Sequence, residues 1–154
     1  MNILLGIDMS PHATETVSQL CRMKCPEGSS VHVLSVVAAT EPQFAPQPHV
    51  LAAVAGRLEM IEAQEMGFHQ RLLDTTLETL RRAGFVVTGE IVHGDPRHVL
   101  VETAARRGVD LMVVGSHGGG GIGRALVGSV ASWVVAHAPC NVMVVRRAET
   151  TPAG

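Results

Sequence analysis

The chain has 154 residues, a formal net charge of −2 at neutral pH and an isoelectric point near 6.4. The length predicts one domain with a sizeable core, and the balanced charge argues against a nucleic-acid or anionic-membrane partner. No apolar run approaches the roughly 20 residues of a membrane-spanning helix, and the first residues lack the basic start of a signal peptide. The three cysteines Cys21, Cys25 and Cys140 have no paired spacing, so we expect a cytoplasmic protein without disulfides.

Apolar runs alternate with helical patterns along the whole chain. In order, we expect a strand over 2–7, a helix from 11 to about 24, a strand over 31–37, a loop over 38–48, a helix from about 50 to 83, a strand over 85–92, a helix between 95 and 108, a strand over 111–114, a helix from 128 to about 137 and a strand over 142–145. Runs that are apolar on both faces are typical of strands buried within a parallel sheet.

Local signals mark the ends of the helices. Ser10-Pro11 and Asp95-Pro96 are typical helix starts, and Gly84 and Gly108 are typical helix ends. The loop 38–48 holds three prolines and is the expected mobile segment. The long helix has a mostly apolar stripe, near which lie Leu58, Ile61, Glu65, Phe68, Leu72 and Leu80. Since Gly56 and Gly67 weaken this helix, we expect that it forms as two pieces.

The alternation predicts the α/β fold class, with one open, mostly parallel five-stranded sheet and helices on both faces. Crossovers between such strands are right-handed in nearly all proteins. We expect one domain over residues 1–147 and a polar tail over 148–154.

A glycine-rich stretch follows the fourth strand. The apolar run 111–114 stops at Gly115, and Gly128-Ser129 opens the next helix. A helix N-terminus carries unpaired N–H groups and a positive dipole end, so this junction predicts a phosphate site. Asp8 ends the first strand, and it suits ribose hydroxyls or Mg²⁺ if the first and fourth strands are neighbours. The alternative for Asp8 is a turn or cap residue before Ser10.

Two common glycine motifs do not explain this stretch. The P-loop pattern would place Arg124 where lysine belongs and Ala125 where the magnesium-binding hydroxyl belongs, so we reject it. A G-x-G-x-x-G match at Gly118, Gly120 and Gly123 is close to unavoidable within four consecutive glycines, and it lies late in the chain.

A longer spacing is more specific. Gly115, two residues, Gly118, nine residues and then Gly128-Ser129 resembles the phosphate-binding pattern of the universal stress protein family. Gly6-Ile7-Asp8 after the first strand is similar to the start of that family. The resemblance extends from Ile3 to Arg146 and is to the ATP-binding branch, which keeps these glycines.

The resemblance implies a Rossmann-like sheet of strand order 3-2-1-4-5 and a bound ATP, ADP or AMP, with Mg²⁺ on the side of Asp8. The implied nucleotide-binding residues are Gly6, Ile7, Asp8, Val36, Val114, Gly115, His117, Gly118, Arg124, Gly128, Ser129 and Val130. Val36 would offer backbone to the adenine, and Arg124 would face the terminal phosphate. Gly119, Gly120 and Gly121 depart from the family's pattern, and we expect this loop to be mobile without ligand and ordered with it.

We therefore expect an ATP-binding stress-response or signalling protein with slow or absent hydrolysis. The alternatives are an enzyme that cleaves ATP or transfers a group from it, and an interaction module that needs no nucleotide. The eight histidines show no metal-binding spacing. In the implied order the strand 142–145 lies at an edge of the sheet, so we expect a homodimer formed through it.

Overall fold

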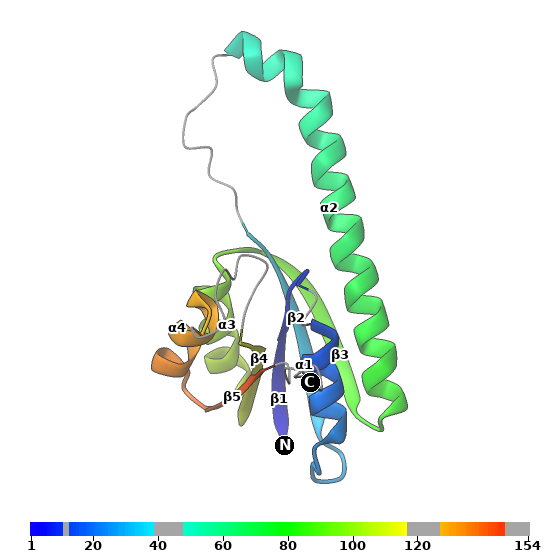
Figure 1. Cartoon of the computed structure of the whole chain (residues 1–154), viewed down its shortest axis with the longest axis vertical. Helices are drawn as coiled ribbons and strands as arrows, with labels where there is room; N and C mark the ends of the chain where they lie inside the picture. The colour runs from blue at the N-terminus through cyan, green and yellow to red at the C-terminus, as the bar shows by residue number, and fades with distance from the viewer. Residues whose placement is uncertain (11–12, 39–47, 117–126, 147–154) are drawn as a thin grey trace, which may run out of the picture.

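A computed structural model describes residues 1–10, 13–38, 48–116 and 127–146 (Figure 1). The elements are β1 (Asn2–Ile7), α1 (Ala13–Arg22), β2 (Ser30–Ala38), α2 (Pro48–Arg82), β3 (Val86–Gly94), α3 (Pro96–Arg107), β4 (Leu111–Gly115), α4 (Ser129–His137) and β5 (Asn141–Val145). All strand pairs are parallel, and the order in the sheet is β3-β2-β1-β4-β5. The predicted fold class and strand order are confirmed.

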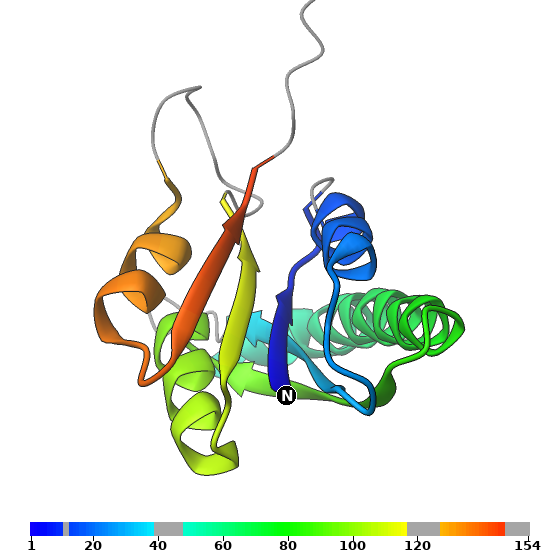
Figure 2. The same ribbon diagram turned by 90° about the horizontal axis from the view of Figure 1, so that it is seen from below.

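The helices form one layer on each face of the sheet (Figure 2). On the first face, α1 and the second half of α2 pack through Val17, Leu20 and Leu80 against the alternate residues of β1 that include Leu5. On the second face, α3 and α4 pack against the strand residues that alternate with these, such as Leu4 of β1. The sheet is therefore covered on both sides, which explains why its central strands are apolar throughout.

Helix α2 is one continuous element, so the predicted division at Gly56 and Gly67 is wrong. A glycine inside a helix costs about 1 kcal/mol relative to alanine. Two such costs do not break a 35-residue helix whose second half is anchored in the core through Leu73 and Leu80.

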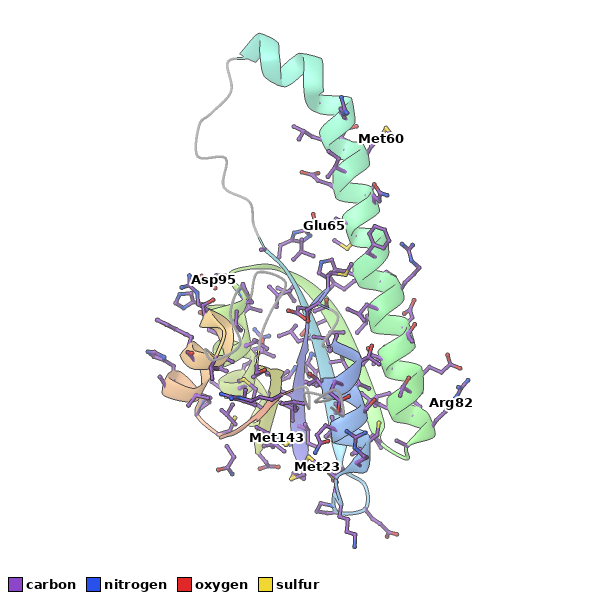
Figure 3. The ribbon with its side chains drawn as sticks, viewed as in Figure 1. Met23, Met60, Glu65, Arg82, Asp95 and Met143 are labelled. Atoms are coloured by element: carbon purple, nitrogen blue, oxygen red, sulfur yellow. The ribbon has the colours of Figure 1, made fainter. Side chains whose placement is uncertain are left out.

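Only the second half of α2 packs on the sheet; its first half extends past the carboxyl ends of the strands (Figure 1). Leu80 is fully buried, whereas the side chains of Leu58 and Ile61 are 43% and 54% exposed. Met60 and Glu65 lie on this extending part (Figure 3). The expected apolar stripe is thus buried at one end only. In the part of the chain described, no helix is both long and apolar enough to span a membrane.

The predicted ends of α3 are confirmed in detail. The Asp95 carboxylate accepts a hydrogen bond from the Arg97 N–H at 2.9 Å, and Pro96 occupies the first helical position. Hydrogen bonds from Arg97, whose guanidinium also pairs with this carboxylate, lower the pKa of Asp95 to about 2. Gly108 closes the helix in the left-handed conformation, with φ of 59°. The tail predicted over 148–154 and most of the loop 38–48 lie outside the described residues.

Candidate functional site

The strand order changes direction between β1 and β4. β1 pairs with β2 on one side and with β4 on the other, in the register of Ile3 with Leu111. The helices that follow these two strands lie on opposite faces of the sheet, α1 on one face and α4 on the other (Figure 2). In open α/β sheets, ligands bind at the carboxyl ends of strands at such a point. Asp8, which follows β1, and Gly115, which ends β4, therefore lie at the same edge.

Asp8 is half-buried and makes a turn with Ser10. Its Oδ1 accepts hydrogen bonds from the Ser10 backbone N–H at 3.1 Å and from the Ser10 hydroxyl at 2.5 Å. The turn role that was the alternative prediction for Asp8 is thus confirmed. It engages Oδ1, so it does not preclude a ligand contact through Oδ2.

The N-terminus of α4 is fastened to the end of β4. The Gly128 N–H donates to the Ser116 carbonyl at 2.6 Å, and the Ser116 N–H donates to the Val145 carbonyl at 2.8 Å. Gly128 is the N-cap residue and has no side chain to accept from the first turn. The amides of Ser129 and Val130 belong to that first turn, where N–H groups have no partner within the helix. Their dipole and donors favour an anion here.

At three of the predicted site residues, the side chain, or the space that one would occupy, lies within the packed core. Ile7 is buried in the cluster beneath α1, and Val114 is buried in the cluster beneath α3 and α4. A Cβ at Gly6 would lie 3.0 Å from a methyl group of Leu100 and 3.2 Å from one of Val114. These residues can therefore meet a ligand only through their backbone, and the glycine is explained by packing alone.

Val36 lies near the carboxyl end of β2. The pairing of Ile7 with Ser35 places Val36 one residue further along, level with Asp8 on the neighbouring strand. Val36 is half-buried and packs in the cluster of the α3 and α4 face. The structure thus brings Asp8, Val36 and Gly115 to one edge of the sheet. His117, Gly118, Arg124 and the run Gly119–Gly121 lie outside the described residues.

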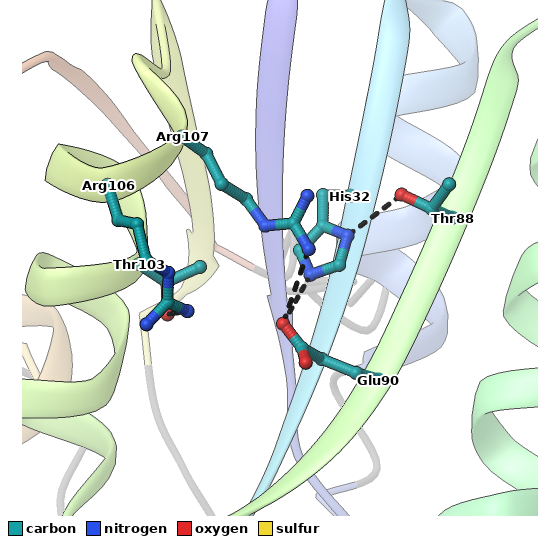
Figure 4. A network of polar contacts seen from close by, with 6 residues as sticks. All are labelled: His32, Thr88, Glu90, Thr103, Arg106 and Arg107. Atoms are coloured by element: carbon teal, nitrogen blue, oxygen red, sulfur yellow. Dashed lines mark hydrogen bonds and ion pairs between the residues drawn. The ribbon is translucent and has the colours of Figure 1, made fainter.

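A polar network that sequence reasoning missed joins β2, β3 and α3 (Figure 4). His32 is 7% exposed; its Nδ1 lies 2.8 Å from the Thr88 hydroxyl, and its Nε2 lies 2.9 Å from Glu90 Oε1. Arg107 donates to the same Glu90 oxygen at 3.5 Å. His32 pairs in register with Leu4, which places the network away from the carboxyl edge.

The network has a definite protonation pattern. Burial lowers the pKa of His32, outweighing the hydrogen bond to Glu90 that raises it. The hydrogen bond from His32 also lowers the pKa of Glu90. A neutral imidazole therefore donates from Nε2 to the Glu90 carboxylate and accepts at Nδ1 from the Thr88 hydroxyl. Thr88 and Glu90 are polar residues two positions apart, so they lie on the same face of β3. This spacing was the available sequence signal for the network.

The other candidate groups are a buried serine–histidine pair and three cysteines. The Ser35 hydroxyl and His69 Nδ1 lie 2.7 Å apart, both buried, between β2 and α2. All three cysteines are free and half-buried, and burial raises the pKa of Cys21 and of Cys140. Among the described residues, no three His, Cys, Asp or Glu side chains are grouped to hold a metal ion.

Trp133 lies where α3 and α4 meet. Its ring stacks on His137 at 3.9 Å between centroids and meets the His98 ring edge-on at 5.1 Å. The Arg97 guanidinium lies 5.8 Å from the ring. Trp133 thus packs between the two helices.

The strand order, with the N-terminus of α4 at the switch point, defines a Rossmann-like α/β protein with a nucleotide-binding fold. A model of the universal stress protein family matches residues 1–146. The chain belongs to the universal stress protein family.

Relatives are similar over nearly the whole chain. The universal stress protein MJ0577 of Methanocaldococcus jannaschii is 28% identical over 152 residues, which cover 94% of each chain. The solved structure of MJ0577 matches with a TM-score of 0.77 at 24% identity over 97% of each chain. UspA from Lactobacillus plantarum matches with a TM-score of 0.74 at 28% identity, over 95% of this chain and 97% of its own.

Some matches are shorter, and two solved structures of similar fold contain a nucleotide. A universal stress protein A-like protein of Arabidopsis thaliana is 35% identical over 56% of this chain and 49% of its own. The Arabidopsis protein At3g01520 has AMP bound and matches with a TM-score of 0.68 at 17% identity, over 100% of this chain and 96% of its own. A universal stress protein in complex with cAMP matches with a TM-score of 0.63 at 20% identity, over 95% and 96%.

Proposed function

We propose that this protein binds an adenine nucleotide, ATP, ADP or AMP, at the edge formed by β1, β4 and α4. The observation that carries the proposal is the hydrogen bond from Gly128 to Ser116, which fixes the first turn of α4 beside the end of β4. The phosphates bind the free amides of this turn, at Ser129 and Val130. The ribose lies toward Asp8, and the adenine toward the backbone at Val36.

The N-cap of α4 suits a phosphate group. An N-cap glycine presents only backbone, so an anion can approach the helix end closely. The bound AMP and cAMP of the two structural neighbours are adenine nucleotides, in proteins of the same fold. In the sequence, Gly118 and Arg124 complete the set of residues proposed for the phosphates.

Mg²⁺ fits this site only as a companion of the nucleotide. Mg²⁺ keeps several waters and is commonly held by one carboxylate together with substrate phosphates. Asp8 offers such a carboxylate oxygen, while no ready-made cage of three metal ligands exists within the described ranges. When bound, the ion would neutralise phosphate charge near Asp8.

We propose slow or absent hydrolysis. The site has donors for phosphate, yet the described residues form no group of ligands for a pair of metal ions, a device that phosphatases and nucleases use for phosphoryl cleavage. The role is then that of a cytoplasmic stress-response or signalling protein whose state depends on bound nucleotide. Repeated release of phosphate from ATP, with each turnover completed within seconds, would favour the enzyme alternative.

Two measurements test binding. The purified protein is denatured, and the released small molecules are identified by chromatography and mass spectrometry. Thermal unfolding is then followed with AMP, ADP and ATP, each with and without Mg²⁺. A ligand at 100 times its dissociation constant stabilises the fold by about 2.7 kcal/mol. If none of the three shifts the transition and none co-purifies, the nucleotide-independent interaction module is the better description.

We also propose a homodimer formed through β5. This strand has β4 as its strand neighbour and lies at the end of the sheet order. Its outward N–H and C=O groups would pair with the same strand of a second copy, which removes an open sheet edge.

A further inference from the structure

Ser10 holds one oxygen of the Asp8 carboxylate from two directions. Both the backbone N–H and the hydroxyl of Ser10 donate to Oδ1, at 3.1 and 2.5 Å. Ser10 itself is buried, so water competes little for these hydrogen bonds. The carboxylate therefore has one engaged oxygen and one that remains for a ligand.

The turn that carries this pair is fixed at both ends. Before it, Ile7 is the last paired residue of β1 and is buried in the core. After it, the Ser10 carbonyl accepts from the Ala13 N–H at 3.2 Å, which ties the turn to the start of α1. Rotation of the Asp8 carboxylate thus requires the loss of hydrogen bonds inside a turn that is tied to β1 and to α1.

We infer that Ser10 is a positioning residue of the nucleotide site, which orients Asp8 so that it meets its ligand through Oδ2 alone. The inference rests on the proposed function and specifies how Asp8 works within it. A single carboxylate oxygen accepts from a ribose hydroxyl or takes one coordination position of Mg²⁺. A two-oxygen clamp across both ribose hydroxyls is excluded by the engagement of Oδ1.

Two substitutions separate the roles of the two oxygens. Asp8→Asn keeps an oxygen for the Ser10 donors and replaces the ligand-facing acceptor by an NH₂ group. Ser10→Ala keeps the carboxylate and removes its hydroxyl anchor. By calorimetry we expect AMP affinity to fall about fivefold in Ser10→Ala, the effect of one hydrogen bond, and more than about tenfold in Asp8→Asn. Ser10→Thr retains the hydroxyl and should bind within about twofold of the wild type.

A double variant that combines Asp8→Asn with Ser10→Ala tests whether Ser10 affects binding by positioning Asp8 or through a general structural role. If Ser10 acts through Asp8, adding Ser10→Ala to Asp8→Asn has no further effect on AMP affinity. The same fivefold loss in both backgrounds would overturn the inference, as would an unchanged affinity in Ser10→Ala alone. Circular dichroism of each variant checks that the fold is retained.

A ligand-free measurement keeps this test separate from the proposed function. Hydrogen exchange of the Ser10 amide should be slow in the wild type and in Asp8→Asn, and about tenfold faster in Asp8→Ala, which offers no acceptor. If the wild type binds no adenine nucleotide while this pattern holds, the proposed function fails although the Ser10–Asp8 contact stands. Equal exchange in all three proteins would refute the positioning itself.

Discussion

The Gly128 N–H and the Ser116 carbonyl meet at 2.6 Å, which joins the start of α4 to the residue after β4. The glycine-rich segment between them therefore begins and ends at one place on the sheet edge. Through this hydrogen bond, the first turn of α4 presents its amides at the edge where Asp8 lies. The proposed anion site is thus built on two elements of the fold, β4 and α4.

Gly128→Asp should separate helix stability from nucleotide binding. Aspartate is a better N-cap than glycine by a few tenths of a kcal/mol, so the thermal transition should rise slightly. Its charge would occupy the position proposed for phosphate, and AMP affinity should fall about tenfold or more. Gly128→Asn, a neutral cap of similar size, is the matched control: it fills the same space without the charge and should lose clearly less affinity than Gly128→Asp. Equal binding by both variants would contradict a phosphate at this helix end.

Val144→Pro should convert the proposed dimer to a folded monomer. The Val145 carbonyl bonds toward β4, and alternate residues of a strand direct their N–H groups to opposite sides, so the Val144 N–H is directed to the open edge. Proline is tolerated on an edge strand where the missing N–H faced outward. Met143→Pro, in contrast, removes a donor directed to β4 and should destabilise the fold. Sedimentation equilibrium of Val144→Pro that still gives the mass of the wild-type dimer would refute pairing through β5.

Acid should destabilise the fold through His32. Its pKa is lowered in the folded protein, so the unfolded chain binds a proton more readily, and stability is lost as the pH falls below the unfolded value near 6.5. Glu90, whose pKa is also lowered, adds a loss of the same sign at lower pH, below its unfolded value near 4.5. In denaturant titrations from pH 8 to 5, His32→Gln should show a flatter dependence than the wild type. Parallel profiles would show that His32 does not set this slope.

The two halves of α2 should respond differently to substitution. Leu80→Ala removes a fully buried side chain and should cost about 2–5 kcal/mol of unfolding free energy. Ile61→Gln, on the extending half, should change it by less than about 0.5 kcal/mol. Chemical denaturation measures both. A large loss in Ile61→Gln would mean that this surface is covered in solution, and sedimentation would then show whether a second copy covers it.

The strands were predictable because the sheet is buried on both faces, whereas their order was predicted only from the resemblance to the universal stress protein family. In such strands, burial selects apolar residues at every position, so runs such as 111–114 stand out from their surroundings. The ends of α3 were predictable for a local reason, since Asp95 and Gly108 act within one turn of the backbone. Asp8 and Gly115 could be assigned to one edge once the strand order was known.

Contacts between residues that are far apart in the sequence could not be predicted from the sequence. His32 and Glu90 are far apart in sequence, and only the register of β2 with β3 makes them neighbours on one face. The continuity of α2 could not be predicted either, because it depends on anchorage of Leu73 and Leu80 in the core and not on the local cost of Gly67. The two oxygens of Asp8 also have different surroundings, which no sequence pattern reports.

The central position of β1 has a consequence for synthesis on the ribosome. β1, β2 and β3 emerge in succession and can pair as they appear, whereas Ile3 must wait for Leu111. Until then, one edge of the first strand is open, and such edges promote association between nascent chains. Pairing over so long a separation is also slow. The addition of β4 and β5 also creates the edge proposed for the nucleotide, so a half-made chain lacks that edge.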